Sequence, residues 1–252
     1  MTNPLFDLSG KTALITGSSQ GIGLALAHGL ADAGVTIILN GRTQQKLDQA
    51  ALQFGGEVHT SVFDVTDSAA VTGAIDGIES EIGPVDILVN NAGMQIRNKL
   101  DEFADEDWQR LMRTNLDSVY YVSKAVARYM IAREAGKIVN IASVNAKLGR
   151  PGIAPYTASK GAIVMLTQGM CADWAQHNIQ INSLAPGYFD TELTSALVND
   201  AEFTAWLKNR TPSRRWGDVK ELQGACVFLC SPGSSFVNGH TLYVDGGIGA
   251  VL

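Results

Sequence analysis

The segment "TALITGSSQGIGLALAHGLADAG" (residues 12–34) joins an apolar run to a helical pattern through a glycine-rich turn. Residues 12–16 predict a buried strand, and Ile22, Leu26 and Leu30 recur on one stripe of the following helix. Glycines permit a tight turn, and the free N–H groups at the start of a helix can bind a phosphate. The segment therefore predicts a turn that binds the pyrophosphate of a dinucleotide, with an ordinary glycine-rich turn as the alternative.

The same order of strand and helix repeats along the chain. Further apolar runs that predict strands lie at residues 35–39, 58–65, 84–93, 137–143, 179–187 and 240–247. Helical stretches are expected at residues 44–54, from residue 105 and from residue 154. Because the runs are apolar throughout, they are typical of strands covered on both faces.

This pattern predicts an α/β fold of the Rossmann type: a doubly wound parallel sheet with helices on both faces. We expect a single domain over residues 1–252, with a less regular region at about 188–216.

The composition indicates a globular protein and excludes several classes. The 252 residues are 46% hydrophobic and 17% charged, which is enough for a sizeable core. The net charge of −6 argues against a nucleic-acid-binding protein. No window approaches the roughly 18 apolar residues of a membrane span, and residues 1–11 lack the basic and apolar regions of a signal peptide. We therefore expect a cytoplasmic protein that binds neither nucleic acid nor membrane.

The cysteines do not indicate a disulfide framework or a metal site. Cys171, Cys226 and Cys230 are odd in number, and only the last two share a helix face. No further thiol or histidine cluster completes a ligand set, so buried, reduced cysteines and no metal are expected.

The end of the second predicted strand bears on the choice of dinucleotide. A carboxylate at this point favours a free ribose 2′-hydroxyl, whereas a basic residue favours a 2′-phosphate. The chain has Asn40, Gly41 and Arg42 there, without a carboxylate, which favours NADP. The alternative is that Arg42 is a solvated residue at the start of a helix.

The segment "APYTASKGAIVML" (residues 154–166) places Tyr156 and Lys160 one helical turn apart. A phenol titrates near pH 10 unless its surroundings shift its pKa. A lysine charge on the same helix face favours the phenolate, which makes the tyrosine a usable acid and base near neutrality. Taken alone, such a pair is more often simply exposed at the start of a helix.

Four features occur together in order: "TGSSQGIG" at 16–23, "NNAG" at 90–93, Ser143, and Tyr156 with Lys160. In this the chain resembles the short-chain dehydrogenase/reductase family, over nearly its whole length from Leu8 to Gly247. Three further segments resemble the gluconate 5-dehydrogenases (5-keto-D-gluconate reductases) of that family: "MQIR", "YFDTELTSALVND" and "AWLKNRTPSRRWGD".

The resemblance implies a catalytic group of Asn115, Ser143, Tyr156 and Lys160. Tyr156 would exchange a proton with the substrate oxygen during hydride transfer, and Ser143 would hydrogen-bond the same oxygen. Asn115 would hold a water that connects Lys160 to solvent.

The resemblance also implies a cofactor site. Its residues are Gly17, Ser19, Gln20, Gly21, Ile22, Gly23, Asn40, Arg42, Asp64, Val65, Asn90, Asn91, Ala92, Gly93, Tyr156, Lys160, Pro186, Gly187 and Thr191. Gln20 departs from the family pattern, because many members that use NADP have a basic residue there. NADP is the expected cofactor, and use of NAD remains open.

The segments expected around the substrate are polar. Arg97, Arg150, Arg210, Arg214 and Arg215 could each pair with a carboxylate. We hypothesise that Arg97 binds the carboxylate of a sugar acid and that Gln95 and Asn145 meet its hydroxyl groups, with Ser143 and Tyr156 at the reacting oxygen. The alternative is that these polar side chains face solvent.

The sequence thus favours an NADP-dependent oxidoreductase of carbohydrate metabolism that interconverts D-gluconate and 5-keto-D-gluconate. The alternatives are a reductase of another polar carbonyl, such as a different keto-sugar acid or a 3-oxoacyl thioester, and a nucleotide-sensing protein without catalysis. The helical segments 105–132 and 156–176 are largely apolar. By the family resemblance they imply a homotetramer, although a helix buried inside a monomer has the same pattern.

Overall fold

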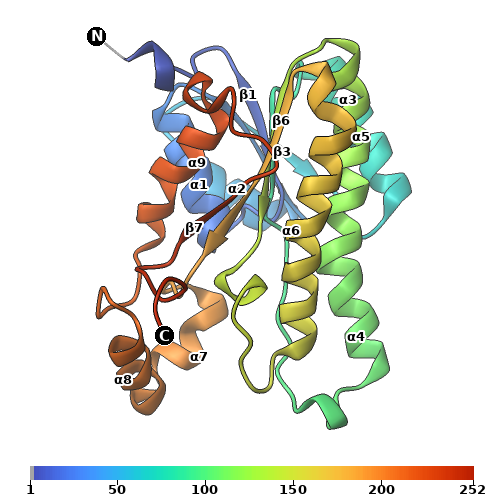
Figure 1. The fold of residues 1–252 in the computed structure, drawn as a ribbon. Coiled ribbons are helices and arrows are strands. Elements are labelled where there is room, and N and C mark those ends of the chain that lie inside the picture. Colours follow the sequence, from blue (N-terminus) through green and yellow to red (C-terminus); the bar gives the residue numbers. More distant parts are fainter. Residues whose placement is uncertain (1–2) are drawn as a thin grey trace.

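The computed structural model describes residues 3–252, which build a seven-stranded parallel sheet with helices on both faces (Figure 1). The strands are β1 (Thr12–Ile15), β2 (Thr36–Gly41), β3 (Val58–Val62), β4 (Ile87–Asn90), β5 (Gly136–Ile141), β6 (Ile179–Pro186) and β7 (Thr241–Val244). Their order is β3-β2-β1-β4-β5-β6-β7, and every neighbouring pair is parallel. The predicted fold class is confirmed. Residues 1 and 2 of the predicted domain lie outside the described residues.

The helices follow the strands as the repeated pattern predicts. They are α1 (Gly21–Asp32), α2 (Gln44–Ala51), α3 (Ser68–Glu81), α4 (Asp105–Met112), α5 (Ser118–Ala132), α6 (Ala154–Trp174), α7 (Ser195–Val198), α8 (Ala201–Arg210) and α9 (Gln223–Cys230). A π-helical turn (Arg113–Asp117) joins α4 to α5, so the single helix expected from residue 105 is interrupted.

Side chains of each strand alternate between the two layers of the core. In β1, Ala13 and Ile15 pack with α1 and α9, whereas Leu14 packs with α3, α5 and α6 on the other face. Figure 1 shows the same division, with α1 and α9 on one side of the sheet and α5 and α6 on the other. Leu26 and Leu30 of the predicted stripe are fully buried in the first layer, and Ile22 packs against it.

Two expectations about the sheet need correction. The predicted strands 58–65 and 84–93 are too long, because the chain leaves the sheet after Val62 and Asn90. Strand β3 lies at the edge of the sheet and is only half-buried, so the prediction of full coverage is wrong there. Apolar content reports burial in the core as a whole and does not show where a strand ends.

The region 188–216 is more regular than predicted, because it contains α7 and α8. Aromatic packing that a helical period does not reveal holds α8 in place. Phe203 packs with Tyr188, Trp206 and Trp216, and Trp206 also packs with Tyr188.

Cys226 and Cys230 are buried free thiols, as predicted. Within residues 3–252, no helix is both long and apolar enough to cross a membrane. The same residues contain no cluster of histidine, cysteine or acidic side chains suited to a metal ion.

Candidate active site

A cleft of about 1110 Å³ opens at the carboxyl ends of the strands. Residues that follow β1, β2, β3, β4, β5 and β6 all line it. Strand order reverses between β1 and β4, and open α/β sheets bind ligands at such a reversal. Most of the site residues predicted above line this cleft. The exceptions are Gly23, Asn90, Asn115 and three of the five arginines, Arg210, Arg214 and Arg215.

The glycine turn is shaped by contacts that exclude side chains. Gly17 has a φ of +61°, and a Cβ on it would lie 2.9 Å from the Cα of Ala92. Its N–H donates to Oδ1 of Asn40 over 3.3 Å. No side chain caps α1, so its first N–H groups keep their donors for a ligand. This arrangement fits the pyrophosphate of a dinucleotide.

Gly23 lies beneath the turn rather than in the cleft wall. A Cβ there would lie 2.4 Å from Nδ2 of Asn91 and 2.6 Å from the carbonyl oxygen of Gly17. Asn91 uses that amide to hold the carbonyls of Thr16 and Gly17. Gly23 therefore permits close packing between helix and turn, and its predicted contact with the cofactor is replaced by this supporting role.

We expect Gly23→Ala to lower the free energy of unfolding by about 1–3 kcal/mol, because the backbone of Gly17 must shift. Dinucleotide affinity should fall with it. The matched control is Gly73→Ala in α3, where a Cβ meets nothing within 4 Å. Urea unfolding and fluorescence titration with NADPH measure both effects, and equal behaviour of the two variants would contradict this account.

At the far end of the cleft, Arg42 is exposed and lies near Asp64. Burial acts to raise the pKa of Asp64. Hydrogen bonds from Thr66 and the charge of Arg42 outweigh it and hold that pKa below its usual value. Lys46, which the sequence analysis did not single out, lines the same end. The site thus has cations and no carboxylate at the end of β2, which suits a 2′-phosphate.

The side-chain amides of Asn40 and Asn90 form hydrogen bonds within the protein. Nδ2 of Asn40 donates to the carbonyls of Ser61 and Phe63. Nδ2 of Asn90 donates to Ser123 and Asn140 inside the core, so Asn90 is not in the cleft. The side chain of Asn90 therefore fixes the end of β4 inside the core, and an approach of the cofactor to the backbone of this segment remains a prediction.

Ser143, Tyr156 and Lys160 meet in the cleft from two elements. Ser143 lies two residues after the end of β5, while Tyr156 and Lys160 lie one turn apart on α6. The ammonium of Lys160 donates to the carbonyl of Ile141 over 2.7 Å and lies 5.7 Å from the centroid of the Tyr156 ring. Lys160 is buried, with 5% of its surface exposed.

Burial dominates the ionisation of both groups. It lowers the pKa of Lys160 from 10.5 to about 8. It also raises the pKa of Tyr156, with a hydrogen bond to Ser143 and the charge of Arg97 acting in the opposite direction. The charge of Lys160 is not among the causes that shift the pKa of Tyr156, and its ammonium is hydrogen-bonded to a backbone carbonyl.

Asn115 lies behind the cleft wall in the π-helical turn and is fully buried. Its Oδ1 accepts from the N–H of Met94 over 2.8 Å, and its Nδ2 donates to the carbonyl of Met94 over 2.9 Å. A Cβ on Gly93 would contact both Asn115 and Lys160, at 3.4 and 3.8 Å. Asn115 thus fixes the segment after β4 beside the lysine, and its predicted water remains a prediction.

The substrate end of the cleft is polar. The guanidinium of Arg97 donates to Oε1 of Gln95 over 3.2 Å, and Asn145 donates to the carbonyl of Leu148. Arg150 and Tyr188 line this end too. Tyr188 was not predicted, although its place directly after Pro186 and Gly187 in "PGYFD" was an available signal.

The remaining arginines lie elsewhere. Arg215 forms a two-point ion pair with Glu221, Arg214 donates to Asn209, and Arg210 donates to the carbonyl of Val251. None of the three lines the cleft, so they are removed as candidates for the carboxylate.

A contact across the cleft joins its two walls. Gln20, at the glycine turn, donates to the carboxylate of Glu192, which follows Thr191 in the loop after β6. Gln20, where the chain departs from the family pattern, is therefore hydrogen-bonded to Glu192, a contact that the sequence alone does not indicate.

Comparison with known proteins gives consistent matches. The family described as short chain dehydrogenase matches residues 11–202. Gluconate 5-dehydrogenase of Gluconobacter oxydans is 58% identical over 252 residues, 98% of each chain. 5-Keto-D-gluconate 5-reductase of Escherichia coli is 52% identical over 249 residues, again 98% of each. A gluconate 5-dehydrogenase from Burkholderia cenocepacia, solved in complex with NADP and tartrate, is 56% identical, with a TM-score of 0.97 over 99% of each chain.

Proposed function

Because this chain belongs to the short-chain dehydrogenase family, we propose that it interconverts D-gluconate and 5-keto-D-gluconate with NADP as cofactor. It is an oxidoreductase of that family. The observation that carries the proposal is one cleft that brings the glycine turn, the Ser143–Tyr156–Lys160 group and Arg97 together. Proteins that share about half or more of its residues are named for this reaction.

NADP, when bound, supplies or accepts the hydride. The chain supplies the proton: Tyr156 donates it from its phenol oxygen to the carbonyl oxygen of the ketone. Its raised pKa keeps that proton in place at neutral pH, which suits the direction of reduction. The Ser143 hydroxyl gives the same oxygen a second hydrogen bond as negative charge develops on it. Lys160, with a pKa of about 8, is charged at neutral pH.

Arg97 would bind the carboxylate of the sugar acid, while Gln95 and Asn145 would contact its hydroxyl groups. The charge of Arg97 reaches Tyr156, so the arginine lies near the reacting end of the site. A guanidinium next to neutral amides suits an anionic, hydroxylated chain better than an apolar acyl group.

The test is turnover of a substrate panel with NADPH and with NADH. It should contain 5-keto-D-gluconate, other keto-sugar acids and a 3-oxoacyl thioester. We expect the highest kcat/KM for 5-keto-D-gluconate with NADPH. Turnover of another member of the panel without 5-keto-D-gluconate would refute the proposed substrate. Tight NADP binding without turnover of any member would favour a nucleotide sensor.

Cofactor preference provides a sharper prediction for one residue. We expect Arg42→Ala to raise the KM for NADP roughly 10- to 100-fold, because a charge-assisted contact to the 2′-phosphate is lost. The KM for NAD, which lacks that phosphate, should stay near its wild-type value. Equal changes for both cofactors would place Arg42 outside the 2′-phosphate site, and Lys46→Ala would then be the next variant to measure.

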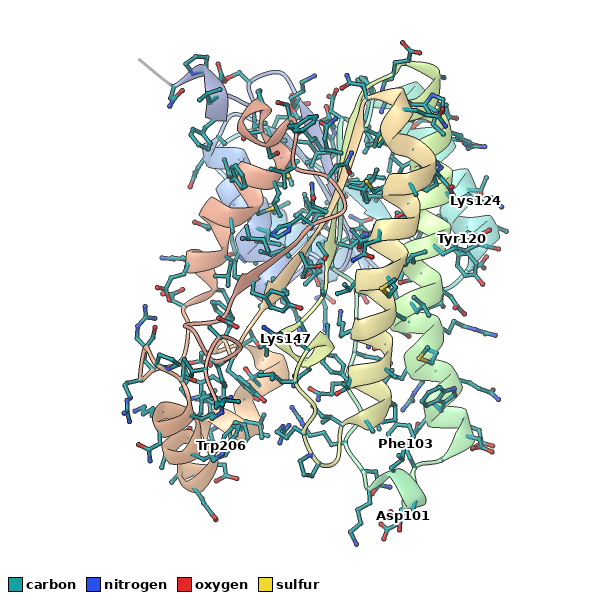
Figure 2. All side chains as sticks on the ribbon, viewed as in Figure 1. Asp101, Phe103, Tyr120, Lys124, Lys147 and Trp206 are labelled. Atoms are coloured by element: carbon teal, nitrogen blue, oxygen red, sulfur yellow. The ribbon has the colours of Figure 1, made fainter. Side chains whose placement is uncertain are left out.

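We also propose that the protein lies in the cytoplasm and forms a homotetramer. Support for the tetramer comes from large apolar side chains that are exposed on the helices predicted to pair: Trp108 on α4, Tyr120 on α5 and Met165 on α6. Figure 2 shows Tyr120 on the outer side of its helix. Light scattering of the purified protein measures the assembly, and the mass of a monomer or a dimer would refute it.

A further inference from the structure

Arg150 lies in the wall between two cavities. Together with Asn145 and Tyr188, it lines the cleft and also a smaller cavity of about 130 Å³ beside it. The segment that carries it, residues 142–153 between β5 and α6, contains Ser143 and leads into the first turn of α6, where Tyr156 lies. The arginine is thus part of the same short stretch of chain as the two residues at the reacting oxygen.

Arg150 contacts an aromatic cluster. Its guanidinium carbon lies 5.1 Å from the centroid of the Phe203 ring. Phe203 in turn packs with Tyr188, Trp206 and Trp216, at centroid distances of 5.8, 5.1 and 6.2 Å. Figure 2 shows Trp206 of this cluster on α8. A cation–π contact favours this position of the guanidinium while leaving its N–H donors free for a ligand.

Among residues 3–252, no group forms an ion pair with Arg150, and its Nε is buried without a hydrogen-bond partner. A second cation, Arg97, is close by. Burial lowers the pKa of Arg97 most, and the positive charge of Arg150 is the second cause that lowers it. The hydrogen-bond partner of Arg97 is the neutral amide of Gln95. Two neighbouring guanidiniums without a bound carboxylate repel each other, and an anionic ligand would relieve that repulsion.

We propose that Arg150 is a second carboxylate-binding residue, which with Arg97 makes the site select sugar acids over their uncharged analogues. This rests on the proposed function, because it takes a sugar acid as the substrate. Arg97 is exposed, whereas Arg150 contacts the ring of Phe203, so Arg150 presents its donors with less loss of side-chain freedom on binding. Its planar fork matches both oxygens of a carboxylate.

The experiment compares D-gluconate with D-gluconamide, which keeps every hydroxyl group and replaces the carboxylate by a neutral amide. For Arg150→Gln we expect kcat/KM for D-gluconate to fall roughly 10- to 100-fold, mostly through KM, with little change for D-gluconamide. Arg150→Lys keeps the charge without the fork and should lose a smaller factor. The matched control is Lys147→Gln, which removes a cation three residues earlier and outside both cavities.

The ratio of the two kcat/KM values separates binding from folding. A variant that only disturbs α8 lowers both values together and leaves the ratio unchanged, and that result would overturn the assignment. The same holds if Lys147→Gln lowers the ratio as much as Arg150→Gln does. If the wild type is inactive on D-gluconate but turns over another sugar acid, the proposed substrate fails. The ratio of kcat/KM for that acid to kcat/KM for its amide, measured in wild type and in Arg150→Gln, then tests the role of Arg150 independently of the proposed substrate.

Discussion

Tyr156→Phe lowers kcat for 5-keto-D-gluconate by roughly 10²- to 10⁴-fold, while the affinity for NADPH and the free energy of unfolding stay near their wild-type values. The substitution removes only the phenol oxygen, which is the proton donor in the proposed reaction. Because the ring and its packing on α6 are kept, the substitution should slow the chemical step without affecting cofactor binding or folding. Steady-state kinetics, NADPH titration and urea unfolding of the same preparation measure the three quantities.

Tyr129→Phe is the matched control, because it removes a hydroxyl that donates to Asp76 outside the cleft. It should turn over substrate at the wild-type rate. If Tyr156→Phe keeps more than about a tenth of wild-type kcat, the proton comes from another group and the proposed role of Tyr156 is wrong.

Lys160→Met is expected to lower kcat by roughly 10²- to 10³-fold, because the buried positive charge beside the reacting groups is lost. It should also change how stability depends on pH. A pKa lowered from 10.5 to about 8 corresponds to roughly 3 kcal/mol of free energy, which is the cost of burying the ammonium.

The sign of the pH effect follows from proton binding. Below about pH 8 the lysine is charged in both states, so the full cost of burial is present and constant. Between pH 8 and 10.5 the unfolded chain holds more protons than the folded one, and the stability of the wild type rises with pH. The difference in free energy of unfolding between wild type and Lys160→Met should therefore shift in favour of the wild type as pH rises. Urea unfolding at pH 7.5 and 9.5 measures it, and a difference independent of pH would show that this lysine does not titrate there.

Much of the fold is predictable because it depends on local pattern. The apolar runs place all seven strands, and the glycines at 17, 21 and 23 mark the turn that begins α1. Helix α3 was not singled out in advance. Its signals are present in the sequence: Asp67 caps its first N–H groups, and Val71, Ile75 and Ile78 form its buried stripe.

The site is less predictable where function depends on packing between distant segments. Apart from Arg97, the sequence offered four arginines that no pattern separated, and the contact of Arg150 with Phe203 of α8 and its place in the cleft wall distinguish it from the other three. The shifts in pKa at Tyr156 and Lys160 come mainly from burial, which spacing along a helix does not report. Sequence spacing placed these two groups one turn apart, but it did not reveal that burial raises the pKa of the phenol.

The π-helical turn at Arg113–Asp117 limits how this protein can change by insertion or deletion. Such a turn holds one residue more than an α-helical turn. Deleting one residue there would leave an α-helical turn, so α5 could keep the face that packs on the sheet. The deletion would instead remove the wide turn from which Asn115 bonds to the backbone of Met94. The extra residue therefore matters for the cleft wall rather than for the packing of the sheet.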